Sequence, residues 1–459
     1  MRNTSSDQGS NRNGEGATRR LAQAACEYDV DSLSGPLVAK VKVCLRDLIG
    51  CACESYALPW AEQARAAVAL GDGGVSVIGH DRGAGPADAA FVNAVMGHGL
   101  VREDMHAGSI SHLGIVVLPV VLALAGEKRV SGRDLIAAIV VGYETGGQLG
   151  RALMDAEVAR VHRPTGVVGP LAGTAAGARL CGVDEEVCLS ALALATNAVA
   201  GFNQWAWTGG SEMFFEAGAA ARSAVTAVKL AGAGAFGSPD AIEGPAGLCA
   251  ALGKAAAGAR MLPFVAEPEI LSVYHKAVPA CNFAQTPALA ALSIAQEQPL
   301  ESADIAEIIV RVPRAGALYP GCDAQGPYRN VLQGKMSIQF NVATALTRGV
   351  LNEENFALLD DPGIARLVAL TRLEIDEVMT TAYPGQQGGA VEVRLSDGSL
   401  RQARLADVIH AGDSQVTERF EEAIVQRFGR SRAGEIAAAL DTLENLDDAG
   451  ELIRLLRLG

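Results

Sequence analysis

Small and aliphatic residues recur at helical spacing through the first 265 residues, and this pattern limits the folds open to the chain. From about residue 19 to 265, apolar side chains return every three or four positions, as in LVAKVKVCLRDLIGCAC and GPLAGTAAGARLCG. Hydrophobic residues make up 49% of the chain but aromatic residues only 5%, so Ala, Gly, Leu and Val must fill the core. The pattern predicts closely packed helices rather than a β-sandwich.

Two helix starts in this region carry capping residues. Ser131 precedes RDLIAAIVVGYE and Asp184 precedes EEVCLSALALATNAV. Both side chains can accept a hydrogen bond from a free N–H group of a first helical turn.

The character of the sequence changes near residue 270. The segments that predict strands are 303–313, 370–378 and 390–405, the last with an Asp397-Gly398 hairpin turn. The segments that predict helices are 283–297, 335–348, 362–370 and the tail from about 415. We therefore expect a mainly α protein with a smaller α+β domain.

The change in pattern also suggests domain boundaries. We expect residues 1–18 to be a disordered N-terminus, because the opening residues are polar. Residues 19–268 and 412–459 would form an all-helical domain, and residues 269–411 would form the α+β domain.

Charge and hydropathy exclude several classes of partner. The net charge of −14 disfavours nucleic acid and anionic membranes, because both require a basic face. The longest apolar run, Leu113–Ala125, is too short to span a bilayer. With no export signal at the start, the nine cysteines are expected to be reduced thiols, and we expect a cytoplasmic protein.

Two short motifs have structural explanations. Gly232-Ala-Gly234-Ala-Phe-Gly237 fits the dinucleotide pattern GxGxxG, which needs a strand before it, whereas SAVTAVKLAGAG predicts a helix that the glycines terminate. Cys51 and Cys53 lie in an apolar helical segment with no second Cys/His pair at a matching spacing. We interpret them as buried free thiols and expect no metal site.

The stretch HGLVREDMHAGSISHLG, residues 98–114, concentrates acid/base groups. It holds three of the seven histidines together with Arg102, Glu103 and Asp104. The apolar segment after it predicts a buried helix whose first turn could offer free N–H groups to an anion. A structural histidine at a helix end is the alternative explanation, and the residues alone leave both open, although the density of polar groups before a buried segment is what a site would show.

Three further segments are candidates. Arg160-Val-His162-Arg163-Pro-Thr-Gly places cationic groups beside a helix start. Tyr274-His275-Lys276 and Cys281 lie where the helical and α+β regions meet, a position where clefts tend to form. Residues 209–218, followed by Arg222, are equally well explained as an ordinary loop and helix start.

Together and in this order, the segments resemble the MmgE/PrpD family, which includes 2-methylcitrate dehydratase, cis-aconitate decarboxylase and iminodisuccinate epimerase. DMHAGSISHLG resembles the family's aspartate-rich stretch that ends in His-Pro-Gly, and HRPTGVVGPLAGTAAGARLCGVDEE resembles its His-Pro-Thr segment. HKAVPACNF resembles a Lys-x-Tyr-Pro-x-Cys segment. The likeness covers roughly residues 20–455, and it implies a two-domain architecture with the site in the cleft, and a homodimer.

The chain departs from the family where acid/base groups are expected. Val101 stands where many members have an aspartate, and Arg163 replaces the histidine before Pro-Thr, with His162 one place earlier. Met213 and Glu216 replace a lysine and a histidine. Several acid/base groups have therefore changed together.

The resemblance and the residue types together give a set of candidate site residues. The expected catalytic residues are Asp104, His106, His112 and Lys276. The expected substrate-binding residues are Arg102, His162, Arg163, Tyr274 and Cys281. Family chemistry implies no metal and no organic cofactor.

We expect a lyase that removes a proton next to a carboxylate of a small di- or tricarboxylate and eliminates water. His106 or His112 would be the base or acid, with Asp104 orienting the imidazole. Arg163 and Lys276 would hold the carboxylates and the developing charge. An epimerase, an isomerase or a decarboxylase acting on a related polycarboxylate stays open, as does a non-catalytic scaffold.

Overall fold

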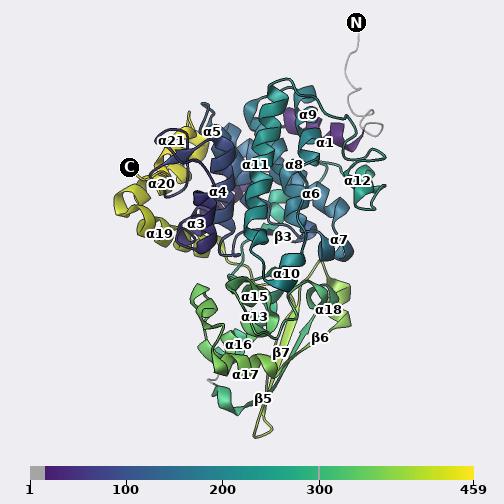
Figure 1. The fold of residues 1–459 in the computed structure, drawn as a ribbon, viewed down its shortest axis with the longest axis vertical. Coiled ribbons are helices and arrows are strands. Elements are labelled where there is room, and N and C mark those ends of the chain that lie inside the picture. The colour runs from purple at the N-terminus through teal and green to yellow at the C-terminus, as the bar shows by residue number, and fades with distance from the viewer. Residues whose placement is uncertain (1–15, 298–299) are drawn as a thin grey trace.

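Helices of the first half of the chain surround one buried apolar helix. The computed structural model describes residues 16–297 and 300–459, and Figure 1 shows a large helical part above a smaller part that contains the main sheet. The helices of the large part, up to residue 251, are α1 (Ala17–Glu27), α2 (Gly35–Glu54), α3 (Pro59–Ala66), α4 (Pro86–His98), α5 (Gly114–Ala125), α6 (Gly132–Leu153), α7 (Ala156–Val161), α8 (Pro164–Cys181), α9 (Glu185–Thr196), α10 (Gln204–Thr208), α11 (Glu212–Gly232) and α12 (Leu248–Ala251).

Close packing through small residues explains why these helices surround α5. All 12 residues of α5 are buried, and the helix contacts α4, α6, α8 and α11. A Cβ added to Gly142 of α6 would lie 2.6 Å from Val117 of α5, and one added to Gly173 of α8 would lie 2.9 Å from Ala224 of α11. Larger side chains there would force the helices apart, so the predicted packing of small residues is confirmed.

The predicted helix signals are also confirmed. Ser131 accepts a hydrogen bond from the N–H of Asp134 at the start of α6, and Asp184 accepts one from Val187 at the start of α9. Helix α11 ends at Gly232, so the glycines of the GxGxxG pattern do terminate a helix.

The α+β part is built on a four-stranded sheet in the order β6-β5-β7-β8. Its strands are β5 (Ile305–Val312), β6 (Thr371–Ile375), β7 (Gly389–Leu395) and β8 (Leu400–Leu405), and its helices are α13 (Gln285–Glu297), α14 (Arg314–Leu318), α15 (Val331–Met336), α16 (Ile338–Arg348), α17 (Pro362–Ala369) and α18 (Glu377–Ala382). β5 pairs in parallel with β6, whereas its pairing with β7 and that of β7 with β8 are antiparallel. The three predicted strand segments are confirmed, and Gly398 takes a positive φ of 85° in the expected hairpin turn.

The C-terminal helices return to the large part. They are α19 (Asp413–Phe428), α20 (Arg430–Asp441) and α21 (Gly450–Leu455), which are yellow in Figure 1. α19 packs against α2, and α21 lies beside β1 (Val75–Ser76), which pairs with β2 (Gly83–Ala84). The N–H of Ala411 donates to the carbonyl of His275 at 2.9 Å. The two places where the chain passes from one part to the other therefore lie side by side. We therefore propose domains of residues 19–268 with 412–459 and of residues 269–411.

The expected disordered N-terminus needs a correction at its end. Residues 1–15 lie outside the described residues, but Ala17 and Thr18 are buried and helical. The Thr18 hydroxyl donates to the Glu243 carboxylate at 2.7 Å, and this long-range contact explains why α1 begins before residue 19.

Two further expectations concern thiols and membranes. Cys51 and Cys53 are buried free thiols inside α2, as interpreted from the sequence. Among the described residues, no helix combines the length and the apolar character that crossing a bilayer requires.

Candidate active site

A short strand pair joins two of the candidate segments. β3 (Met105–His106) pairs antiparallel with β4 (Val273–Tyr274), with Met105 opposite Tyr274. This pairing places the 98–114 stretch against the 274–282 stretch. Figure 1 shows β3 at the lower end of the helical part, above α13 and α15 of the α+β part.

A small cavity of about 40 Å³ lies where the two parts meet. Its wall consists of Val101, Met105, Ile110, His112, Arg163, Pro164, Thr165, Trp205, Met213, Cys281, Asn282, Phe283, Tyr319 and Met336. Three of the predicted site residues, His112, Arg163 and Cys281, therefore share one cavity. The substituted positions Val101 and Met213 also face it.

The hydrogen bonds of His112 determine its tautomer. Nδ1 lies 2.9 Å from the carbonyl oxygen of Asp104 and 3.0 Å from a carboxylate oxygen of Glu103. Both partners can only accept, since a carbonyl and a carboxylate have no proton to donate, so Nδ1 carries the proton and Nε2 keeps its lone pair. Burial and the nearby Lys276 lower the pKa of His112, which favours the neutral imidazole.

A buried chain of hydrogen bonds supports this imidazole. Glu103 also accepts from Nδ1 of His98 at 2.6 Å, and Nε2 of His98 accepts from the Arg163 guanidinium at 2.7 Å. Burial lowers the pKa of His98 to about 4 despite the charge of Glu103. Burial alone would raise the pKa of Glu103, but His98, His112 and Lys276 together hold it well below its usual range. Glu103 is therefore an anion that orients His112.

Arg163 is the cation of the cavity wall, and Glu216, the acid beside it, is largely uncharged near pH 7. Nε of Arg163 lies 3.5 Å from Oε1 of Glu216, and among the described residues neither atom has a hydrogen-bond partner. Burial raises the pKa of Glu216 to about 8, although Arg163 opposes the shift. Near pH 7 the Arg163 charge is thus not neutralised by Glu216, so it remains available to an anion.

Lys276 lies behind the cavity wall. It is fully buried, and its ammonium donates to the carbonyls of Val101 and Ala280. Burial lowers the pKa of Lys276, and the charge of Glu103 opposes this shift. Lys276 therefore affects the cavity indirectly, by holding the backbone carbonyl of Val101 and by the electrostatic field of its ammonium group.

Two non-glycine residues of the wall have left-handed backbone conformations. Val101 has φ of 57° and Ile110 has φ of 53°, a region that β-branched residues rarely adopt and that costs on the order of 1–3 kcal/mol per residue. At Val101 this conformation accompanies the hydrogen bond from its carbonyl to Lys276. Strain of this kind is typical of preorganised sites.

Asp104 and His106, both predicted to be catalytic, point away from the cavity. The Asp104 carboxylate accepts from the Tyr143 hydroxyl and from the N–H of Gly114 at 3.2 Å, so it occupies the first turn of α5 where an external anion was expected. Nε2 of His106 donates to Glu269 at 2.9 Å, and Nδ1 accepts from the N–H of Ser109 at 3.1 Å.

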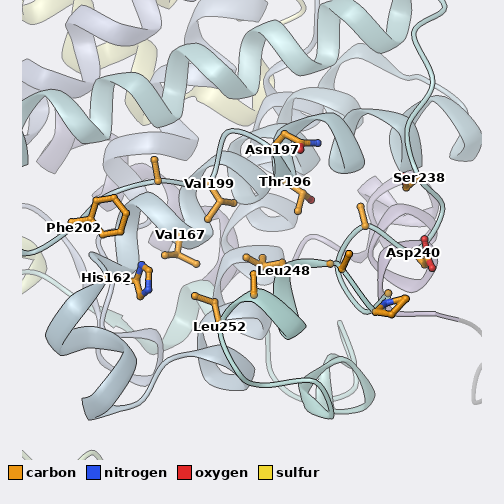
Figure 2. A pocket seen from close by; sticks show the side chains of 17 residues that line it. His162, Val167, Thr196, Asn197, Val199, Phe202, Ser238, Asp240, Leu248 and Leu252 are labelled. Atoms are coloured by element: carbon orange, nitrogen blue, oxygen red, sulfur yellow. The ribbon is translucent and has the colours of Figure 1, made fainter.

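Three predicted substrate-binding residues also lie apart from the cavity. The Arg102 guanidinium pairs with the Glu54 carboxylate. The Tyr274 ring stacks on His410 with centroids 4.2 Å apart, and its hydroxyl donates to Asn282. His162 lines a different hollow of about 530 Å³, shown in Figure 2, where its ring lies near Phe202.

Sequence reasoning missed His98 and Glu103 as site residues. His98 is the last residue of α4, and Glu103 stands between Arg102 and Asp104, both predicted to belong to the site. His98 and Glu103 lie inside the polar stretch 98–114, so the density of charged residues there was the sequence signal that could have identified them. Among the described residues, no group of three or more His, Cys, Asp or Glu side chains is placed to hold a metal ion.

Comparison with known proteins matches both halves of the chain. The model of the MmgE/PrpD N-terminal domain matches residues 19–258, and that of the MmgE/PrpD C-terminal domain matches residues 278–445. A cis-aconitate decarboxylase of Aspergillus terreus (strain NIH 2624 / FGSC A1156) is 29% identical over 237 residues, which is 50% of this chain and 47% of that relative. A cis-aconitate decarboxylase-like protein of Aspergillus oryzae is 31% identical over 194 residues, 40% of each chain. The human cis-aconitate decarboxylase is 35% identical over 117 residues, 24% of each chain. The matches thus span less than half the length of these relatives.

Proposed function

The chain belongs to the MmgE/PrpD family, and from this premise we propose that it is a lyase acting on a small carboxylate. The observation that carries the proposal is one cavity wall that presents an oriented imidazole, His112, and a cation, Arg163. The first moves a proton at carbon and the second holds a carboxylate.

His112 has the properties of a general base or acid. Nε2 keeps its lone pair because Glu103 and the Asp104 carbonyl hold the proton on Nδ1. An imidazole near its neutral form at pH 7 accepts a proton readily, and an adjacent carboxylate stabilises the imidazolium that results. Glu103 rather than Asp104 is the side chain that orients it, so Glu103 is a positioning residue.

Arg163 is suited to hold the substrate. A guanidinium can donate two parallel hydrogen bonds to a carboxylate, and the attraction between the two charges is stronger in a site with little water. The protonated state of Glu216 leaves this charge uncompensated. Negative charge that develops next to the bound carboxylate would then be stabilised by Arg163 and, from behind the wall, by Lys276.

Decarboxylation is the first candidate reaction. The wall includes the apolar side chains of Val101, Met105, Met213, Met336 and Trp205, and an apolar surrounding disfavours a carboxylate relative to neutral carbon dioxide. The carbon–carbon bond breaks, its electron pair stays on the carbon, and the imidazolium of His112 supplies the proton. An anionic substrate would favour that protonated form. The names of the matched relatives support this choice.

Elimination of water, expected from the sequence, is the second candidate, and the neutral form of His112 favours it. Here Nε2 removes a proton from the carbon next to the carboxylate, and the leaving hydroxyl takes a proton from the Tyr319 hydroxyl or the Cys281 thiol, both of which line the cavity.

Incubation with polycarboxylates in heavy water distinguishes these reactions. Citrate-like acids, cis-aconitate, malate derivatives and amino-dicarboxylates are each followed by NMR and by a carbon dioxide electrode. Carbon dioxide release with deuterium at the same carbon supports decarboxylation, loss of water supports dehydration, and exchange alone indicates an epimerase. If no acid is converted, exchanged or bound, the lyase proposal is wrong and a non-catalytic scaffold remains.

The variants His112→Ala and His162→Ala make a matched pair for this test. Both histidines were candidates from sequence, but only His112 lines the cavity. Turnover should disappear in the first variant and persist in the second. We also keep a homodimer in the cytoplasm as part of the proposal, and light scattering of the purified protein tests the dimer.

A further inference from the structure

A larger chamber adjoins the catalytic cavity. It has a volume of about 350 Å³ and is bounded by residues of α7, α14 and α18. Chamber and cavity share three wall residues, Ile110, Phe283 and Tyr319. The shared residues separate the two spaces, so a molecule that reaches His112 from the chamber passes them.

The volumes indicate that the substrate occupies both spaces. A cavity of about 40 Å³ holds on the order of one to three water molecules, which is too little for a polycarboxylate. The chamber, at about 350 Å³, lies within the range of roughly 300–1,000 Å³ that small-molecule sites occupy. A substrate with its carboxylate at Arg163 would therefore extend into the chamber.

The lining of the chamber shows which chemistry it accepts. Its surface includes the aromatic rings of Phe283 and Tyr383 and the aliphatic side chains of Ala159, Ala315 and Leu318. Leu318 is 55% exposed, so an apolar ligand would cover surface that now faces water.

The charged residues of the chamber do not favour a second carboxylate. Arg160 and Glu157 both belong to the exposed side of α7 and have opposite signs. Arg314 is paired with the Glu377 carboxylate. Charges of both signs thus surround the opening, while the interior is apolar.

We infer that the substrate is a carboxylate with an alkyl arm of several carbons, its anionic head at His112 and Arg163 and its arm in the chamber formed by α7, α14 and α18. The inference rests on the proposed function for the position of the head. It adds a specificity site, because the length of the arm rather than a further charge would distinguish substrates.

Calorimetric titration with inert analogues tests the inference. Succinate and its 2-methyl, 2-propyl and 2-pentyl derivatives have the same anionic head and differ only in the arm. Burial of one methylene corresponds to about a fourfold change in affinity. The pentyl compound should therefore bind on the order of a hundredfold more tightly than the methyl compound.

Two pairs of variants locate the arm. Ala315→Phe fills the chamber, whereas Ala317→Phe enlarges a neighbouring half-buried alanine of α14 that does not line it. Leu318→Asp places a charge at the chamber, whereas Leu400→Asp places one at an exposed leucine on β8. The gain with arm length should disappear in the first member of each pair and persist in the second.

The outcomes separate this inference from the proposed function. Equal affinities along the series, or weaker binding of the longer acids, would overturn the inference and leave the lyase proposal standing. Affinity that rises with arm length in a protein that converts no acid would retain the chamber as a binding site and overturn the catalytic proposal. If none of the four acids binds, the inference is wrong, and the heavy-water assay alone decides the lyase proposal.

Discussion

Replacement of Glu216 by glutamine should stabilise the protein, and the gain should grow with pH. The carboxyl is buried beside Arg163, and burial raises its pKa to about 8 from an ordinary value of 4.5. At a pH between these two pKa values, Glu216 keeps its proton in the folded protein and releases it in the unfolded chain. Stability is therefore lost as the pH rises above 4.5, and no more is lost above about 8.

The size of the effect follows from the pKa difference. Each pH unit between the two pKa values costs about 1.4 kcal/mol of unfolding free energy. At pH 7 the accumulated cost is about 3 kcal/mol, and above pH 8 it levels off near 5 kcal/mol. A glutamine of the same shape does not ionise, so Glu216→Gln avoids this cost, and the difference from wild type should fall to about 0.7 kcal/mol at pH 5.

Urea unfolding of both proteins at pH 5, 6, 7, 8 and 9 measures this difference directly. All other groups titrate alike in the two proteins and cancel. Glu212→Gln, an exposed glutamate on the same helix, is the control and should stay within about 0.5 kcal/mol of wild type throughout. Parallel curves for wild type and Glu216→Gln would refute the reasoning.

The same ionisation should affect ligand binding. Above about pH 8 the Glu216 carboxylate competes with a substrate carboxylate for Arg163. Succinate affinity should therefore fall in wild type between pH 7 and 9, and fall less in Glu216→Gln.

Three other predictions concern the buried histidines. His112→Ala should lower turnover by about 10²–10⁴-fold, whereas His106→Ala should lower the unfolding free energy by about 2–3 kcal/mol because it removes a buried charge-assisted hydrogen bond. Equal losses of turnover in the two variants would contradict the role of His112. Glu103→Gln should lower kcat more than it raises KM, since it disturbs the orientation of the base, and an unchanged pH–rate profile would count against a positioning role. Asp47 lies 2.9 Å from His275 and raises the pKa of that histidine to about 10 despite its burial. The pair's contribution to the unfolding free energy is therefore full below pH 6.5 and is lost as the pH rises through 10. Asp47→Asn should cost about 3 kcal/mol at pH 7, and a cost that did not shrink toward pH 10 in unfolding experiments would argue against the pair.

The fold was largely readable from the sequence because its determinants are local. Ser131 and Asp184 cap helices because each directly precedes a segment with helical periodicity, whose first turn offers the N–H groups that they bind. The hairpin at Asp397-Gly398 depends on the conformational freedom of one glycine. The parallel pairing of β5 with β6 was not predicted, since register between distant segments depends on tertiary contacts.

The candidate site was readable only in part. Polar density pointed to the segment that holds His112, which shares a cavity with Arg163 and Cys281. The direction of each side chain was not readable, because successive residues of a strand point to opposite faces. Met105 of β3 therefore lines the cavity, while its neighbour His106 meets Glu269 on the other side.

The sequence by itself determined the helical packing, the family and the segment that carries the acid/base groups, since these depend on spacing and residue type along the chain. Tertiary structure decided which of those groups act together. The Asp104 carboxylate accepts from the free N–H of Gly114 in the first turn of α5, and the Glu103 carboxylate accepts from both His98 and His112. A carboxylate binds the donors that folding brings to it, and those donors lie on α4, on the loop before α5 and, through Arg163, at the start of α8.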